Sequence, residues 1–178
     1  MLANAGILTG VGDQRRDVTT FVDAIDVMLN GVYFTIEAAL PAILRHGEGG
    51  AIVITSSAAG LKSISPGFDT MSAGAAGYNA AKHGVVGLMR YFATSLAEKN
   101  IRVNSVHPGG VATPMIINEA AGRFVAETGG FGIAHQPLMN IPSMEPEVVS
   151  DAMVYLCGAS GKCLTGVMLP LEGGLALR

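Results

Sequence analysis

The chain has 178 residues, of which 49% are hydrophobic and 14% charged, and its formal net charge at pH 7 is −3. This length supports one domain with a sizeable core, so we expect residues 1–178 to form a single domain. The weak negative charge and the absence of any Lys/Arg-rich run argue against nucleic acid or an anionic membrane as partner. No charge-free apolar run reaches about 18 residues, so no membrane span is expected.

The sequence predicts a reduced, cytoplasmic protein without a metal site. Residues 1–6 contain neither a basic leader nor a long apolar run, so they do not read as a signal peptide. Cys157 and Cys163 have no neighbouring Cys or His at metal-ligand spacing. The histidines share no such spacing either: His46, His83, His107 and His135.

Residues 1–5 are predicted to be a short buried strand, which runs into the glycine series Gly6-x-x-x-Gly10-x-Gly12. This spacing can mark a dinucleotide phosphate loop. In such a loop an apolar helix follows at once and points its N-terminal N–H groups at the phosphates. Here a charged segment at residues 13–17 follows instead. We therefore do not interpret these glycines as a phosphate loop.

From residue 20 to about residue 46, apolar side chains recur every three or four positions, which predicts a long helix. Pro41 and a cluster of glycines at 47–50 are expected to end it. Residues 51–55 form a continuous β-branched run that is typical of a parallel strand buried on both faces. This strand ends at Ser56 and Ser57, where open α/β sheets bind ligands.

A Gly/Ser-rich loop at residues 61–76 precedes a predicted helix at 77–98. In this helix Tyr78 and Lys82 are four residues apart and project from one face. A phenol loses its proton near pH ~10 in water, and a cation beside it favours the phenolate. With a hydroxyl donor nearby, the pair could oxidise an alcohol or reduce a carbonyl. The spacing alone leaves open that both residues merely occupy a solvated helix face.

The remaining segments complete an alternation of strands and helices. Residues 101–107 are predicted to be a strand, which Pro108-Gly109-Gly110 stops, and residues 115–144 a functional lid or binding loop. A helix with Pro146 in its first turn is expected to run to about Cys157, followed by a last strand at 166–171. This alternation predicts a parallel sheet with helices on both faces.

Several of these motifs together resemble the short-chain dehydrogenase/reductase family. They are Asn4-Ala5-Gly6, Ser57, Tyr78-x-x-x-Lys82, Pro108-Gly109 and the closing segment 164–174. The resemblance covers nearly the whole chain and is strongest to actinobacterial members similar to carveol dehydrogenases. It implies an α/β fold: a partial Rossmann-like, doubly wound parallel sheet lacking the first β-α-β-α-β unit. Residues 1–178 would then be the C-terminal two-thirds of such a domain.

The resemblance implies an NAD(P)-dependent oxidoreductase that interconverts a secondary alcohol and a ketone. Tyr78 would be the general acid/base, and Ser57 would position the substrate carbonyl. Lys82 would lower the phenol pKa and hold the nicotinamide ribose. The binding site for NAD or NADP would be lined by Asn4, Ala5, Gly6, Tyr78, Lys82, Pro108, Gly109, Val111 and Thr113. The resemblance also implies that helices 20–46 and 77–98 form a tetramer or dimer interface.

Two departures from the family pattern stand out. Met28 occupies the place of the family's catalytic Asn in Asn-x-x-Gly-Val, and Asn30, two residues on, is expected to face another way. The chain also starts after the family's N-terminal unit, so the strand at residues 1–5 would stand at an open edge. Three interpretations follow: an enzyme recorded with too late a start, an inactive fragment, or a pseudoenzyme that retains its oligomerisation helices.

Two further alternatives concern the substrate and the reaction. The 115–144 segment contains the apolar residues Met115, Ile116, Ile117, Phe124, Phe131 and Met139. They could line a pocket for a hydrophobic alcohol or ketone, such as a terpenoid or steroid, or could form a packed flap without substrate contact. A serine hydrolase acting through Ser57 is weaker, because Ser57 lacks the G-x-S-x-G elbow. Thr55, Ser56 and His83 are expected to have structural roles.

Overall fold

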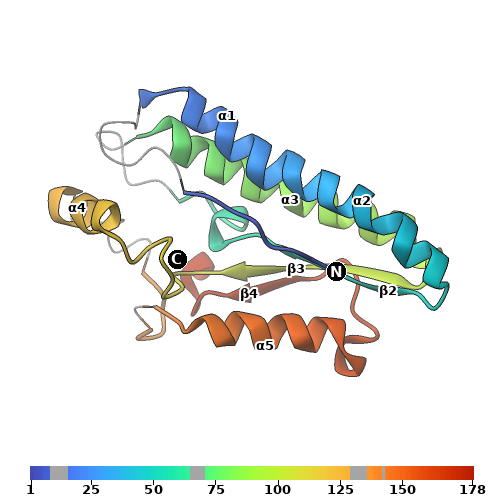
Figure 1. The fold of residues 1–178 in the computed structure, drawn as a ribbon. Helices are drawn as coiled ribbons and strands as arrows, with labels where there is room; N and C mark the ends of the chain where they lie inside the picture. The colour runs from blue at the N-terminus through green and yellow to red at the C-terminus, as the bar shows by residue number, and fades with distance from the viewer. Residues whose placement is uncertain (9–15, 65–70, 129–135, 142) are drawn as a thin grey trace.

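The computed structural model describes residues 1–8, 16–64, 71–128, 136–141 and 143–178. Within them, four strands form one parallel sheet in sequential order: β1 (Leu2–Ala3), β2 (Gly50–Thr55), β3 (Ile101–Pro108) and β4 (Met168–Leu171). Helices α1 (Thr19–Ile25), α2 (Gly31–His46) and α3 (Ala73–Leu96) lie on one face, and α5 (Pro146–Cys157) lies on the other (Figure 1). The predicted parallel sheet with helices on both faces is confirmed.

Helices cover both faces of the sheet. Because side chains alternate along each strand, neighbouring residues of one strand enter different cores. Ile52 and Ile54 of β2 point into a core shared with α2 and α3, whereas Val53 packs against α5. The core on the first side includes Val32, Ile36, Val85, Met89, Phe92, Ile101 and Val103. The core on the second side includes Val106, Met144, Val149, Met153 and Leu156. Successive residues at the centre of β2 are all apolar because each of them enters one of these two cores.

The long first helix contains a π-helical turn, η2 (Asp26–Asn30), between α1 and α2. Its signature is the Gly31 N–H, which donates to the Asp26 carbonyl five residues back. The expectation that Pro41 helps to end the helix is wrong: Pro41 lies on the exposed side within α2. The helix ends instead at Gly47, whose φ of 77° is left-handed and favours glycine.

Two elements lie where a loop was expected. Helix α3 begins at Ala73 rather than at residue 77, because the Ser72 hydroxyl accepts from the Ala75 N–H and caps it. Helix α4 (Glu119–Thr128) lies inside the predicted lid segment. Phe131 and the side chain of Phe124 lie outside the described residues, so their proposed places in a substrate pocket are not described.

One helix bears on the expectation that nothing in the chain spans a membrane. In the described part of the chain, the continuous helix Thr19–His46 has the length and composition of a span, with a mean hydropathy of 1.5 over its best window. A helix that packs on a soluble core passes the same test. Here Met28, Val32 and Ile36 of this helix are buried against the rest of the fold.

Helices α1 and α3 pack closely at Gly77, the residue before Tyr78. A Cβ atom placed on Gly77 would lie 2.8 Å from the Phe21 carbonyl oxygen and 2.9 Å from Ala24 Cβ. Only glycine allows the two helices to approach so closely. This crossing fixes the first turns of α3, and with them Tyr78, relative to α1.

Candidate active site

The predicted site residues gather at one edge of the sheet. Asn4 follows β1, Ser57 follows β2, and Pro108 is the last residue of β3. These three strands are parallel neighbours, so their carboxyl ends meet at the same edge, which is where open α/β sheets bind ligands. The Thr55 hydroxyl donates to Asn4 Oδ1 at 2.8 Å, which ties the first two segments together.

Ser57 is buried at the start of a short 3₁₀ turn, η3 (Ala58–Gly60). Its Oγ accepts from the Ala59 N–H at 3.1 Å and lies near enough to Tyr78 to lower the pKa of the phenol. Gly60 lets this turn lie against α3, because a Cβ atom there would overlap Ser56 Oγ and approach the Lys82 carbonyl oxygen. The Ser56 hydroxyl donates to the same carbonyl at 2.8 Å. The strand-end role expected of Ser56 is confirmed.

Tyr78 and Lys82 lie one turn apart on α3, as their spacing predicts. Lys82 Nζ is 5.6 Å from the centroid of the Tyr78 ring and donates to the Thr55 carbonyl oxygen at 2.9 Å. Lys82 is only 4% exposed, and Tyr78 is half-buried. The described structure therefore brings Ser57, Tyr78 and Lys82 together.

Burial shifts the pKa values of both residues away from their charged forms. Desolvation raises the pKa of the Tyr78 phenol, and the hydrogen bond from Ser57 opposes this rise. Desolvation also lowers the pKa of Lys82 from 10.5 to about 8. The role of Lys82 in lowering the phenol pKa stays a prediction, because the shift of Tyr78 has desolvation as its largest cause. The phenol is thus protonated at neutral pH.

Gly6 lies close to the Lys82 ammonium and to the Met28 side chain. A Cβ atom on Gly6 would lie 3.7 Å from Lys82 Nζ and 3.8 Å from Met28 Sδ. Met28 is 1% exposed and belongs to a buried cluster with Ala24 and Ala81, against which Tyr78 packs. Asn30 instead donates to Asp26 Oδ1 and lines an outer groove. The prediction that Asn30 faces away from the site is confirmed.

The segment after β3 is held to the segment before α5. Val111 forms an isolated parallel bridge with Met144, and the Ala112 N–H donates to the Met144 carbonyl oxygen at 2.9 Å. The Gly109 N–H donates to the Leu171 carbonyl oxygen, and Thr113 is half-buried. Gly109, Val111 and Thr113, the three predicted residues after β3, therefore lie in a hydrogen-bonded segment at the carboxyl edge.

Two polar residues at the site were not identified from the sequence as part of it. The Asn79 side chain accepts from the Ile64 N–H and donates to the Ile64 carbonyl, both at 2.9 Å, which fastens the loop after Ser57 to α3. His107 is fully buried behind Ser57, and its Nδ1 lies 2.9 Å from the Ser57 carbonyl oxygen. No spacing rule signals either contact, because both partners are main-chain groups distant in sequence.

The residues present suit the nicotinamide-ribose part of a dinucleotide better than its phosphates. Close to Gly6, the Lys82 ammonium makes one hydrogen bond within the described structure, so it has donors left for hydroxyl groups. At the start of α1, Asp17 Oδ1 accepts from the Thr19 N–H, so a carboxylate and not an open set of N–H donors lies at this helix N-terminus. Gly10 and Gly12 lie outside the described residues.

No group of three or more His, Cys, Asp or Glu residues in the described part of the chain could hold a metal ion. His135 lies outside that part, and Cys157 and Cys163 are exposed free thiols. His83 is exposed and lies near the Asn79 carbonyl oxygen. Metal chemistry has no set of ligands among these residues.

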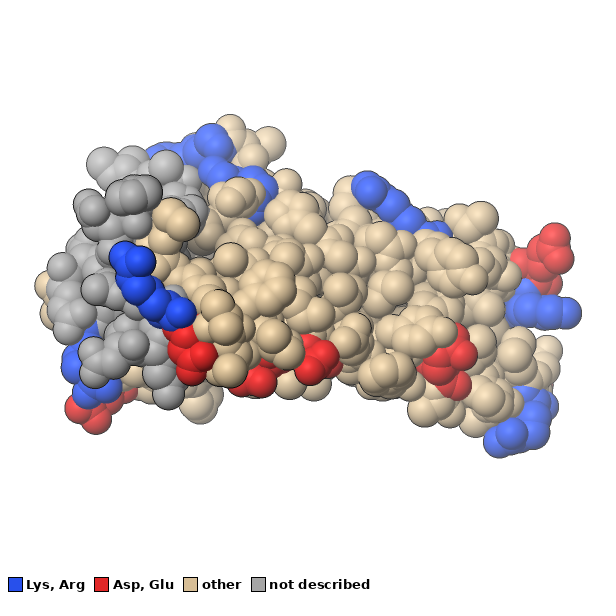
Figure 2. Space-filling view, turned by 90° about the horizontal axis from the view of Figure 1, so that it is seen from above, with Lys and Arg blue, Asp and Glu red and all other residues tan. Residues whose placement is uncertain are grey.

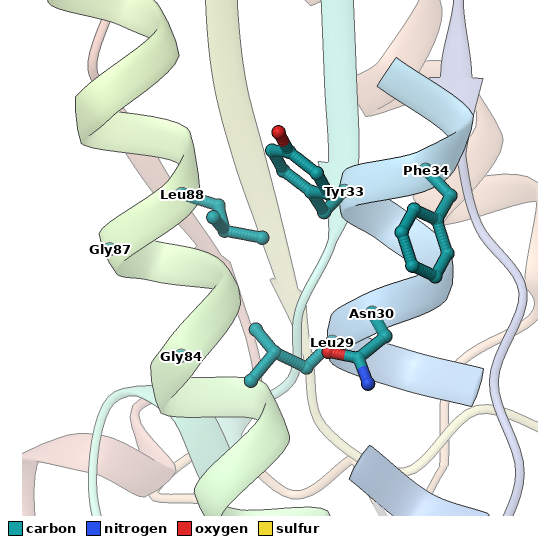
Figure 3. Close-up of a pocket in the computed structure, with 7 residues that line it drawn as sticks. All are labelled: Leu29, Asn30, Tyr33, Phe34, Gly84, Gly87 and Leu88. Carbon is teal, nitrogen blue, oxygen red and sulfur yellow. The ribbon is translucent and has the colours of Figure 1, made fainter. Parts of the chain in front are cut away.

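An apolar groove of about 560 Å³ runs between α2 and α3 on the outside of the fold. Figure 3 shows Tyr33 and Leu88 facing each other across it, with Gly84 and Gly87 on the α3 side. Phe34 beside it is 64% exposed and Tyr91 on α3 is 63% exposed. Charged side chains gather at the margins of this face and are sparse at its centre (Figure 2).

Comparison with known proteins agrees with this geometry. The family model described as enoyl-(acyl carrier protein) reductase matches residues 1–176. The chain is 41% identical over 186 residues to a (−)-trans-carveol dehydrogenase of Rhodococcus erythropolis, covering 99% of this chain and 64% of the relative. It is 36% identical over 173 residues to a cyclohexanol dehydrogenase of Acinetobacter, covering 96% of this chain and 61% of the relative.

Among solved structures, carveol dehydrogenase from Mycobacterium avium in complex with NAD superimposes with a TM-score of 0.85 at 35% identity. The match covers 99% of this chain and 64% of that one. The chain thus spans less than two thirds of the length of the relatives it matches. With a family model that matches nearly all of its residues and relatives that are named dehydrogenases, the chain belongs to the short-chain dehydrogenase/reductase family.

Proposed function

We propose that this chain carries the catalytic part of an NAD(P)-dependent oxidoreductase that interconverts a secondary alcohol and a ketone. The observation that carries the proposal is the assembly of Ser57, Tyr78 and Lys82 at the carboxyl edge of the sheet. Ser57 influences the pKa of the Tyr78 phenol, so the two hydroxyl groups lie near each other. Residues 1–178 would form a single domain corresponding to the C-terminal two-thirds of these enzymes.

In the proposed mechanism, the chain moves a proton while the cofactor takes part in hydride transfer. A nicotinamide cofactor, when bound, accepts a hydride from the alcohol carbon or gives one to the ketone carbon. The Ser57 hydroxyl donates a hydrogen bond to the substrate oxygen, and the Tyr78 phenol exchanges a proton with that oxygen. Burial keeps the phenol protonated, which suits proton donation during ketone reduction. Asn4, Ala5, Gly6, Pro108, Gly109, Val111 and Thr113 would line the cofactor, beside Tyr78 and Lys82.

The proposed substrates are hydrophobic alcohols and ketones of the cyclic kind named in the relatives. NAD is favoured over NADP because a carveol dehydrogenase structure of 35% identity contains NAD. Exposed apolar side chains beyond β3 would contact the substrate: Met115, Ile116, Ile117 and Met139. A cytoplasmic location accords with the free thiols of Cys157 and Cys163.

Calorimetric titration of NADH and NADPH tests this proposal. The purified 178-residue chain is compared with a form extended upstream in frame in the source genome, and Lys82→Met is the negative control in both. We expect NADH to bind at least one form, and the binding form to produce NADH from NAD⁺ and cyclohexanol or carveol. If neither form binds a nicotinamide cofactor, the dehydrogenase proposal fails, and an inactive fragment or pseudoenzyme remains.

We further propose that the face made by α2 and α3 joins copies of the chain in a dimer or tetramer. The apolar groove lined by Leu29, Tyr33, Phe34 and Leu88 supports this, because exposed apolar patches with charged margins are typical of protein interfaces. Gly87 has no atom within 4 Å of a Cβ position, so a facing helix could approach it closely.

Placing a charge in the groove is expected to dissociate the oligomer. Phe34→Glu would bury an unpaired carboxylate in the interface, so light scattering after size-exclusion chromatography should show a lower mass than for the parent chain. Val125→Glu on α4 is the matched control, since Val125 is also exposed (56%) but lies outside the groove. An unchanged mass for Phe34→Glu would rule out this interface.

A further inference from the structure

His107 occupies the position on β3 next to the turn that carries Ser57. It is the last residue before Pro108, and no part of its side chain is exposed. Its Nδ1 lies 2.9 Å from the Ser57 carbonyl oxygen, and its Nε2 lies 2.8 Å from Ser105 Oγ. Both ring nitrogens therefore have partners, one on the neighbouring strand's turn and one on its own strand.

These partners fix the tautomer of the imidazole. A main-chain carbonyl oxygen can only accept a hydrogen bond, so the proton must be on Nδ1. Nε2 then has a free lone pair and accepts from the Ser105 hydroxyl. Desolvation lowers the pKa of His107, and the charges of Lys82 and His83 add to this, although the bond to Ser57 opposes it. The ring is therefore a neutral, directional donor.

The carbonyl that His107 contacts belongs to the residue whose hydroxyl meets Tyr78. The Ser57 backbone is extended, with φ −168° and ψ 165°, and its carbonyl also accepts from the Gly60 N–H at 2.8 Å. The Gly60 bond lies within the turn itself, so it cannot hold the turn against the sheet. The bond from His107 does so, because it comes from the adjacent strand.

We propose that His107 is a positioning residue: its Nδ1–H holds the Ser57 carbonyl so that the Ser57 hydroxyl stays on the Tyr78 phenol. This inference rests on the proposed dehydrogenase function for its kinetic consequence, but its hydrogen bond can be tested without activity. The ring nitrogens of His107 bind Ser105 and the Ser57 main chain rather than the phenol. Its effect is on the direction of the Ser57 side chain.

Two substitutions separate positioning from simple packing. The amide nitrogen of Asn can take the place of Nδ1, whereas the longer Gln side chain places its amide near Nε2. We expect His107→Asn to keep kcat within about 3-fold of the parent and His107→Gln to lower kcat about 10-fold or more, with KM little changed in both. This factor is what loss of one well-directed hydrogen bond amounts to. Ser105→Ala, which leaves the bond to Ser57 intact, should behave like His107→Asn.

Equal loss of kcat in His107→Asn and His107→Gln would overturn the proposal, because a packing role does not distinguish the two amides. An NMR measurement on the parent chain tests the hydrogen bond from His107 even if the variants do not fold or the chain is inactive. In ¹⁵N-histidine NMR spectra of the parent chain, the proton should be on Nδ1 of His107. A proton on Nε2 would overturn the positioning role whatever the enzyme's activity, whereas absent turnover with the Nδ1 proton in place would overturn only the proposed function.

Discussion

Replacing Lys82 with Met is expected to stabilise the fold by about 2 kcal/mol at pH 7. The buried ammonium has a pKa of about 8, against 10.5 for an ordinary lysine, so burying its charge costs about 3 kcal/mol below pH 8. Met has a similar length and no charge, and the change forfeits about 1 kcal/mol from the bond to the Thr55 carbonyl. Urea unfolding of both proteins at pH 7 measures the difference.

The pH dependence of this effect has a definite sign. Between pH 8 and 10.5 the unfolded chain keeps the proton on Lys82 while the folded chain releases it. Stability of the parent protein therefore rises with pH across this window, and below pH 8 the penalty is present in full. The advantage of Lys82→Met should be constant below pH 8 and should shrink as the pH approaches 10.5.

Lys99→Met is the control for this experiment. Lys99 is an exposed lysine just beyond α3, so its replacement should change stability by less than about 0.5 kcal/mol at any pH in the window. A Lys82→Met protein that is less stable than the parent at pH 7 would mean that the ammonium is stabilised by its surroundings. The gain in stability should be accompanied by loss of cofactor binding. Such a trade-off is common where a buried charge costs stability but is needed for function.

Tyr78→Phe is expected to lower kcat by about 10² to 10⁴-fold in whichever form of the protein binds the cofactor. This is the usual contribution of a positioned general acid or base, and phenylalanine removes the only group proposed to exchange the proton. KM should change little. The loss of the hydrogen bond to Ser57 should lower the free energy of unfolding by about 1 kcal/mol.

Tyr91→Phe provides the comparison. Tyr91 lies on the same helix as Tyr78, but it is more than three turns further along and 63% exposed. Its kcat should equal that of the parent within error. Steady-state rates of NADH production, with circular dichroism as a check of folding, decide the result. Retention of kcat within about 3-fold by Tyr78→Phe would remove Tyr78 from the mechanism.

The arrangement of the sheet could be predicted because its signals are local. β2 is a run of β-branched residues, and β3 carries Ile101, Val103 and Val106 among polar residues. The i, i+4 spacing of Tyr78 and Lys82 already places both on one face of a helix. Parallel strands then bring Asn4, Ser57 and Pro108 to one edge. Each of these steps needs only periodicity and the geometry of parallel strands.

The features that sequence analysis missed depend on contacts between distant segments. The bonds from His107 to Ser57 and from Asn79 to Ile64 join a side chain to main-chain groups, whose positions no residue pattern reports. The raised pKa of Tyr78 comes from burial, which outweighs the opposing effect of Ser57 and which the i, i+4 spacing does not report. Helix α3 starts earlier than expected because the Ser72 cap outweighs the low helix propensity of the glycines that follow.

Because of the π-helical turn at Asp26–Asn30, the rotation of α1 relative to α2 depends on the number of residues in this part of the chain. Each residue turns an α-helix by about 100°, so deleting one residue from η2 would rotate α1 relative to α2 by that angle. Ala24 would then leave its place against Gly77, while Val32 and Ile36 stayed in the core. A substitution within η2 would keep the relative rotation of the two helices, whereas an insertion or deletion of one residue would separate the helix crossing beside Tyr78 from the sheet that carries Ser57.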